Sequence, residues 1–209
     1  MNTHTLASYK YIFVPSQDPC DLTLLLLHGT GGNEHSLLDI AIQIAPHANL
    51  LSVRGNVTEG TYNRFFARLA EGVFNEEEVI RRAGELSIFI AAAIETHQLA
   101  NTKLVALGYS NGANIASTIL LTTPTALSGA VLLRAMPTLA APSSPVLSQK
   151  PILLISGLGD ELIPPTQTKR LADQLLDADA HLTHTTIEAG HTLQPRDITL
   201  TRHWLTANF

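Results

Sequence analysis

The sequence is poor in charged residues, in cysteine and in long apolar runs. Charged residues make up 15% of its 209 residues, the formal net charge is −5, and the basic residues form no stripe. Nucleic-acid binding calls for clustered Lys and Arg, so we expect no such partner. Cys20 is the one cysteine, which excludes an intrachain disulfide and indicates an incidental thiol.

No segment approaches the roughly 20 consecutive apolar residues that a membrane-spanning helix needs. The first residues, MNTHTLASYKY, lack the apolar core of a signal peptide. We therefore expect a cytoplasmic protein with no membrane partner. His181 and His184 lie three residues apart in a strand pattern, which directs them to opposite faces, so we also expect no metal site.

Hydrophobic residues, by contrast, make up 45% of the chain, in strand-like runs that alternate with helical patterns. This alternation predicts an α/β fold, a mostly parallel sheet flanked by helices, in a single domain over residues 1–209. Strands are expected at residues 9–14, 22–28, 50–53, 103–109, 129–133, 151–156 and 181–187. Helices are expected at 33–44, 76–99, 110–122, 166–178 and 194–208, with irregular chain at 54–75 and a Pro- and Ser-rich loop at 138–151.

The main chemical motif is G-Y-S-N-G, in which Ser110 lies between Gly108 and Gly112. It stands between an apolar strand and a helix rich in small residues, which is the context of a nucleophile elbow. Such a turn holds the serine in strained backbone above the sheet, and the glycines leave the room that the turn needs. Ser110 is therefore the candidate nucleophile. The alternative is a Gly-rich turn with a helix-capping serine.

A serine hydroxyl needs a base to take its proton. His191 follows the last expected strand, in the sequence AGHT, and so lies at the sheet edge where ligands bind in open α/β folds. Asp160 follows the strand of residues 151–156 and would fix the tautomer of the imidazole, with Glu161 as the alternative. The order Ser110, Asp160, His191 is that of nucleophile, acid and histidine in α/β-hydrolases.

Acyl transfer also needs two N–H donors for the tetrahedral oxyanion. We expect one to be the amide of Asn111, directly after the candidate nucleophile. The other is expected in H-G-T-G-G, after the strand of residues 22–28, at the amide of Thr30 with Gly31 as second choice. The alternative, a phosphate-binding loop, lacks both a G-x-x-x-x-G-K motif and a dinucleotide fingerprint, so no cofactor is expected.

Together these segments resemble the phospholipase/carboxylesterase family of α/β-hydrolases, which includes acyl-protein thioesterases. The likeness runs from LLLLHGTGGNEHSLLDIA through LVALGYSNGANIAS to GLGDELIPP and AGHTL. The segments SVRGN and NRFF are similar to small bacterial stress-associated esterases. The resemblance implies an α/β-hydrolase fold with little or no cap, an open acyl cleft, the triad and oxyanion donors named above, and a family tendency to form homodimers.

The resemblance further implies that Arg64, Phe65 and Phe66 border the substrate entrance and that Met136 lines the acyl pocket. Core packing is the alternative for each of them. The expected function is a serine carboxylesterase that hydrolyses small carboxylic esters through an acyl-enzyme on Ser110. Acyl-thioesterase, lysophospholipase and peptidase activities would use the same catalytic triad, and a non-catalytic binding protein of this fold is a further alternative.

Overall fold

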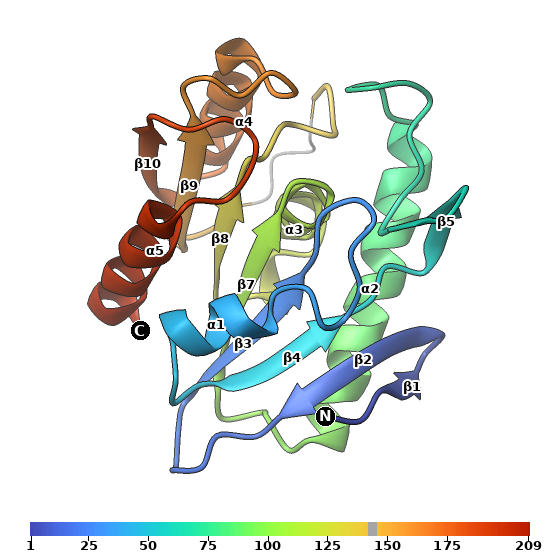
Figure 1. Cartoon of the computed structure of the whole chain (residues 1–209), viewed down its shortest axis with the longest axis vertical. Helices are drawn as coiled ribbons and strands as arrows, with labels where there is room; N and C mark the ends of the chain where they lie inside the picture. Colours follow the sequence, from blue (N-terminus) through green and yellow to red (C-terminus); the bar gives the residue numbers. More distant parts are fainter. Residues whose placement is uncertain (142–145) are drawn as a thin grey trace.

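A computed structural model describes residues 1–141 and 146–209 of the chain (Figure 1). Part of the loop expected at 138–151 therefore lies outside the described residues. The centre is an eight-stranded sheet in the order β1-β2-β4-β3-β7-β8-β9-β10. Its strands are β1 (His4–Leu6), β2 (Tyr9–Val14), β3 (Leu22–Leu27), β4 (Asn49–Val53), β7 (Lys103–Tyr109), β8 (Gly129–Leu133), β9 (Pro151–Gly157) and β10 (His181–Ile187).

The six strands from β4 to β10 run parallel, and β1 and β2 add an antiparallel edge. This confirms the expected mostly parallel sheet. Parallel strands all present their carboxyl ends at one edge, so the loops after β3, β7, β9 and β10 are neighbours in space. The loops that carry the predicted site residues leave the sheet at this edge.

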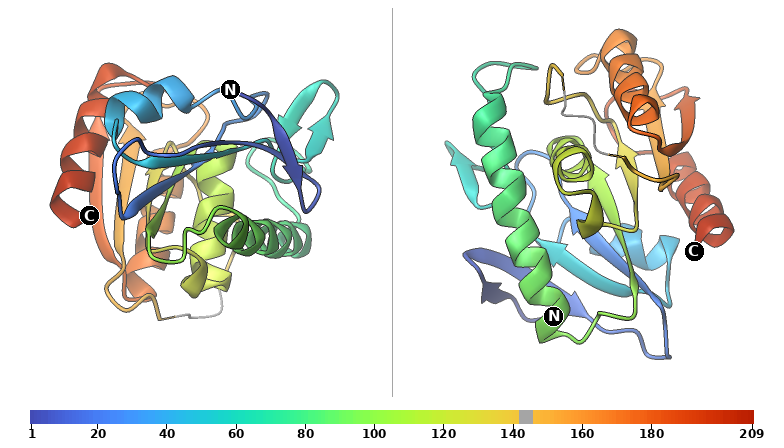
Figure 2. Two further views of the ribbon diagram at one scale, coloured as in Figure 1. Left: turned by 90° about the horizontal axis from the view of Figure 1, so that it is seen from below. Right: turned by 180° about the vertical axis from the view of Figure 1, so that it is seen from behind.

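Helices cover both faces of the sheet (Figure 2). The helices α2 (Glu76–Thr96), α3 (Asn111–Thr122) and α4 (Pro165–Asp177) pack on one face, and α1 (Leu38–Ile44) and α5 (Pro195–Asn208) on the other. The leucine run of β3 contributes side chains to the hydrophobic core on both faces of the sheet, because successive side chains of a strand point to opposite faces. Leu25 and Leu27 pack toward α2 and α3, whereas Leu24 and Leu26 pack toward α1 and α5.

The first helix begins later than the sequence predicts. Helix α1 starts at Leu38 rather than near Asn33, because polar side chains there bind the backbone of a turn. The amide of Asn33 donates to Ser36 Oγ at 2.9 Å, and Asn33 Oδ1 accepts from the amide of His35 at 2.8 Å. These bonds compete with the helical pattern, so the apolar periodicity alone placed the start too early.

Residues 54–75, expected to be irregular, contain a small hairpin of β5 (Val57–Glu59) and β6 (Tyr62–Arg64). Gly60, with a φ of +61°, supplies the left-handed backbone that its turn needs. After β8, the described residues of the connection 134–150 contain no helix, as expected for a fold with little or no cap. Among the described residues, no helix has both the length and the apolar character to cross a bilayer.

Candidate active site

Ser110 occupies a strained turn between β7 and α3. Its backbone has a φ of 51° and a ψ of −115°, which a residue with a side chain adopts only when its surroundings impose it. The amide of Ser110 donates to the Leu133 carbonyl on β8 at 2.9 Å, and its carbonyl accepts from the amide of Asn114 at 2.9 Å. The turn is thus held on both sides, as a nucleophile elbow requires.

The two glycines that flank Ser110 are needed for contact rather than for flexibility. A Cβ on Gly112 would lie 2.0 Å from the carbonyl oxygen of Leu27, and one on Gly108 would lie 2.6 Å from Ala113 Cα. Neither backbone atom can move without shifting the strand or the helix. The motif therefore requires glycine at both positions because α3 packs directly against the ends of β3 and β7.

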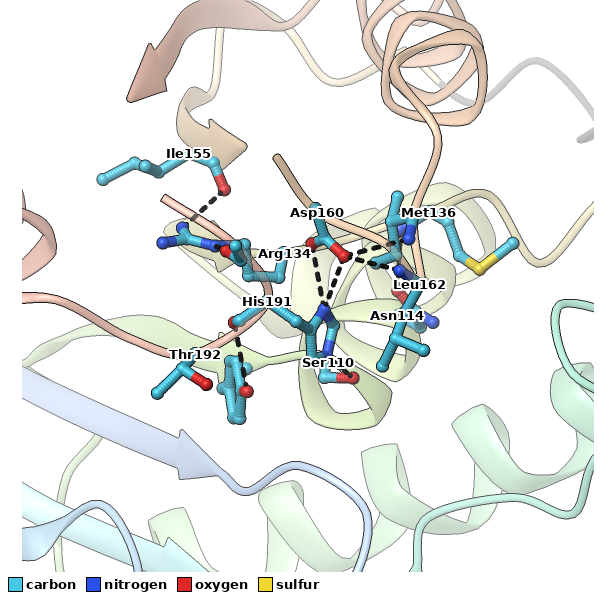
Figure 3. A network of polar contacts seen from close by, with 12 residues as sticks. Ser110, Asn114, Arg134, Met136, Ile155, Asp160, Leu162, His191 and Thr192 are labelled. Atoms are coloured by element: carbon cyan, nitrogen blue, oxygen red, sulfur yellow. Dashed lines mark hydrogen bonds and ion pairs between the residues drawn. The ribbon is translucent and has the colours of Figure 1, made fainter. Parts of the chain in front are cut away.

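Ser110, His191 and Asp160 form one hydrogen-bonded chain (Figure 3). His191 Nε2 lies 2.9 Å from Ser110 Oγ, and its Nδ1 lies 2.9 Å and 3.1 Å from the two carboxylate oxygens of Asp160. A carboxylate only accepts, so Nδ1 carries the proton and Nε2 presents a lone pair to the serine hydroxyl. The arrangement can take a proton from Ser110.

The Asp160 carboxylate is itself held in place. Its side chain is 2% exposed, and its Oδ1 accepts hydrogen bonds from the amides of Leu162 and Ile163 at 2.9 Å and 3.0 Å. Glu161, the alternative acid, is exposed, and within the described residues it makes no hydrogen bond to His191. The geometry therefore favours Asp160 as the partner of the imidazole.

Two residues that the sequence did not single out hold the loop that carries His191. The Tyr109 hydroxyl donates to the His191 carbonyl at 3.2 Å, and burial raises the pKa of Tyr109, which keeps the phenol a neutral donor. Arg134 Nε donates to the carbonyl of Gly190 at 2.9 Å. Arg134 is the only charged residue in the sequence from 129 to 149, and that isolated charge in an apolar stretch was the available signal.

Thr30 and Asn111, whose amides are the expected oxyanion donors, line one cavity with Ser110. Within the described residues neither amide has a hydrogen-bond acceptor. The amide of Gly31, the second choice from the sequence, instead donates to the Asn63 carbonyl at 2.9 Å. The amide of Thr30 is therefore better placed than that of Gly31 to donate a hydrogen bond to a developing oxyanion.

His28, directly after β3, shapes the loop of Thr30. Its Nδ1 donates to the carbonyl of Gly29 at 2.6 Å, and its Nε2 accepts from the amide of Gly55 at 2.9 Å. The side chain is 2% exposed, and burial lowers the pKa of His28 below its ordinary value. His28 is thus a neutral structural histidine and forms no part of the Ser110 chain.

A cavity of about 290 Å³ opens at Ser110 and His191. Its polar lining consists of Thr30, Arg64, Arg68, Glu71, Asn111 and Asn114, and its apolar lining includes Phe74, Met136, Leu162 and Ile163. Arg64 and Met136 are among the residues that line the cavity. Among the described residues, no group of three or more His, Cys, Asp and Glu side chains could hold a metal ion.

The expectation that Phe65 and Phe66 border the entrance is wrong. Both are buried, at 1% and 0% exposure, and neither lines the cavity. Phe65 packs against the ring of His28 at 4.9 Å between centroids, and Phe66 against Phe74 at 5.2 Å. Burial of two large aromatic rings stabilises the fold more than exposure at a pocket rim would, so the chain turns inward after β6.

The sheet, the strained serine turn and the hydrogen-bonded chain at the carboxyl edge define a hydrolase with the α/β-hydrolase fold. The chain belongs to the Phospholipase/Carboxylesterase family, whose model matches residues 10–208.

Known relatives agree with this assignment. MhqD of Bacillus subtilis (strain 168), named as a candidate hydrolase, is 41% identical over 184 residues, which are 88% of this chain and 92% of MhqD. A carboxylesterase of Bacillus cereus is 38% identical, with a TM-score of 0.94 over 97% of this chain and 96% of its own. A carboxylesterase from Mesorhizobium loti is 30% identical, with a TM-score of 0.92 over 99% of each chain.

Proposed function

We propose that this protein is a serine carboxylesterase that hydrolyses small carboxylic esters through an acyl-enzyme on Ser110. The observation that carries the proposal is the unbroken chain of hydrogen bonds from Asp160 through His191 to Ser110, which ends in a cavity of about 290 Å³. A poor nucleophile, a base within hydrogen-bond reach and an orienting carboxylate are the parts that acyl transfer to serine needs.

In the first step Ser110 Oγ attacks the ester carbonyl carbon while His191 Nε2 takes the hydroxyl proton. The carbonyl oxygen becomes negative and accepts hydrogen bonds from the amides of Thr30 and Asn111. Asp160 stabilises the imidazolium that forms. When the tetrahedral intermediate collapses, the bond to the alcohol breaks, the alcohol leaves with the proton from His191 Nε2, and the acyl group stays on Ser110.

In the second step a water molecule takes the place of the alcohol. His191 Nε2 removes a proton from this water as its oxygen attacks the acyl carbon, and the same two amides receive the second oxyanion. Collapse returns the proton to Ser110 Oγ and releases the carboxylic acid. No group besides the chain's own residues and water enters either step.

The cavity supports a preference for short acyl groups. Its volume of about 290 Å³ is close to the lower end of the roughly 300–1,000 Å³ found for small-molecule sites. Met136 and Phe74 line its apolar part with Leu162 and Ile163. A two- to four-carbon acyl chain would find apolar contacts there, whereas a long chain would extend into solvent.

The test compares Ser110→Ala with the parent enzyme on p-nitrophenyl acetate and on longer acyl esters. We expect the substitution to lower turnover by a factor on the order of 10³ or more while the fold stays intact. We also expect kcat/KM of the parent to fall as the acyl chain lengthens. Near-full turnover by Ser110→Ala would refute the proposal. Matched thioesters and lysophospholipids test the acyl-thioesterase and lysophospholipase alternatives. Under either alternative, kcat/KM on the corresponding substrate would exceed kcat/KM on the ester.

A further inference from the structure

Three consecutive residues, Asn63, Arg64 and Phe65, contact both the loop of Thr30 and the start of α3 at Asn111, which carry the candidate oxyanion donors. Asn63 holds the loop after β3 at two points: its carbonyl accepts from the amide of Gly31 at 2.9 Å, and its Nδ2 donates to the carbonyl of Gly32 at 2.8 Å. That loop is exposed at Thr30 and Gly31, and Gly31 has a φ of +83°. These two contacts add to the bond from His28 to the Gly29 carbonyl, which holds the start of the loop.

Arg64 contacts the donor residue itself. Its Nη1 donates to Thr30 Oγ1 at 2.7 Å, and its Nε donates to the carbonyl of Phe66 at 3.0 Å. The guanidinium is 4% exposed and has Glu59 Oε2 at 3.4 Å as its counter-ion. A planar guanidinium fixed at several points is a rigid support, because its nitrogens cannot move independently. Arg64 thereby anchors the exposed Thr30.

Phe65 extends the same segment to the second donor residue. Its amide donates at 2.8 Å to Oδ1 of Asn111, a side chain that is 2% exposed. The segment packs closely on Gly55, because a Cβ at that position would lie 2.3 Å from the carbonyl oxygen of Arg64. Thr30 and Asn111 are 81 positions apart in the sequence, yet both are fixed to neighbouring residues of one segment.

We propose that Asn63–Phe65 is a brace that sets the spacing of the two oxyanion donors, and that Arg64 is a positioning residue for Thr30. The inference rests on the proposed function. Donors act on an oxyanion only when they lie about 2.7–3.1 Å from the place where its charge develops, so a loose Thr30 loop would lower turnover. The guanidinium also places a positive charge beside Thr30, and a buried charge favours a nearby anion more strongly than an exposed one.

The test is a double-mutant cycle on the contact between Arg64 and Thr30. Thr30→Val keeps the amide and the branched shape but removes the oxygen that Arg64 holds, and Arg64→Met keeps an unbranched stem but removes the guanidinium donors. We expect each variant to lower kcat/KM on p-nitrophenyl acetate by roughly 10-fold to 100-fold, the effect of a displacement of about 1 Å. We expect the double variant to be little worse than the poorer single variant, because both break one contact.

A second readout separates positioning from general destabilisation. A trifluoromethyl ketone adds to the serine and forms an oxyanion, so its affinity should fall in Arg64→Met by the same factor as kcat/KM. KM and the affinity of a non-reacting amide analogue should change by less than about threefold, since neither the bound ester before attack nor the bound amide carries an oxyanion. Arg64→Lys should retain part of the kcat/KM and ketone affinity that Arg64→Met loses. The control is Arg202→Met, which removes an arginine that donates to the Gln43 carbonyl, and it should keep parent kinetics.

Independent effects in the double variant, or equal loss of ketone and amide binding, would overturn the positioning role. If Arg64→Met failed to fold, a kcat/KM of Thr30→Val equal to that of the parent would still overturn the positioning role. These outcomes differ from failure of the proposed function, in which the parent protein itself would neither hydrolyse the ester nor bind the ketone.

Discussion

Arg134 and Asp197 form a buried, two-point ion pair behind the candidate active site. Nη1 lies 2.8 Å from Oδ1 and Nη2 lies 2.9 Å from Oδ2, with the two side chains 0% and 2% exposed. Arg134 Nε also holds the carbonyl of Gly190, next to His191, and Asp197 accepts from the amide of Gln194 at the start of α5. The pair thus joins the end of β8, the histidine loop and α5.

Removing the charge of Asp197 should destabilise the fold and weaken catalysis together. Asp197→Asn leaves the buried guanidinium of Arg134 without its anion, which typically costs about 3–5 kcal/mol. We expect the urea midpoint to fall accordingly and turnover to drop because the histidine loop loses its support. Asp173→Asn is the control: it breaks an exposed pair with Lys169 and should change stability by less than about 1 kcal/mol. Equal effects of the two substitutions would contradict this account of the pair.

The contact at Gly112 predicts that even one methyl group there is not tolerated. Gly112→Ala would place a Cβ 2.0 Å from the Leu27 carbonyl oxygen, so α3 must shift and carry the serine turn with it. We expect esterase activity to be lost and the melting temperature to fall. Gly84→Ala in α2 should instead stabilise the protein by about 0.5–1 kcal/mol, because the added Cβ would have no atom within 4 Å outside the backbone of its own helix. An active, stable Gly112→Ala enzyme would show that the turn does not need this close packing.

The choice between two adjacent acids can be measured directly. Asp160→Asn keeps an oxygen for the amides of Leu162 and Ile163 but cannot hold the correct imidazole tautomer. In serine proteases with the same triad, the equivalent aspartate-to-asparagine change lowers kcat by about 10⁴-fold. We expect a large drop of that kind here and parent-like kinetics for Glu161→Gln. The reverse pattern would assign the role to Glu161.

Stability should depend on pH through His28. Burial lowers its pKa in the folded protein below the ordinary value of 6.5. As pH falls below 6.5, His28 is protonated more readily in the unfolded chain than in the folded protein, so the free energy of unfolding falls with pH. We expect urea unfolding of the parent to show this loss between about pH 7 and about pH 5. His28→Gln should be less stable than the parent at neutral pH but should lose less stability on acidification.

The sheet was largely predictable from the sequence, because buried parallel strands are continuous apolar runs with clear ends. The short β1 was not predicted: its hairpin turn uses Ala7 and Ser8 at φ of 44° and 69°, positions where glycine or asparagine would have been the signal. The start of α1 was missed for a similar reason, since the side-chain bonds of Asn33 and Ser36 decided it locally.

The order of Ser110, Asp160 and His191 in the chain predicted which strand ends would meet, because parallel strands share one edge. The supporting residues were not predictable in the same way. Arg134 and Asp197 are 63 positions apart, and only the packing of α5 on the sheet brings them together. The burial of Phe65 and Phe66 also depended on tertiary packing, which the aromatic pair in the sequence does not specify.

The central claim is that Ser110 is the nucleophile, and peptide mass spectrometry after treatment with a fluorophosphonate probe tests it most directly. We predict one phosphonyl group per chain, located on Ser110, with esterase activity lost in proportion to labelling and no labelling of Ser110→Ala. A fully labelled enzyme that retains its activity, or loss of activity with Ser110 unmodified and the probe on another side chain, would contradict the account.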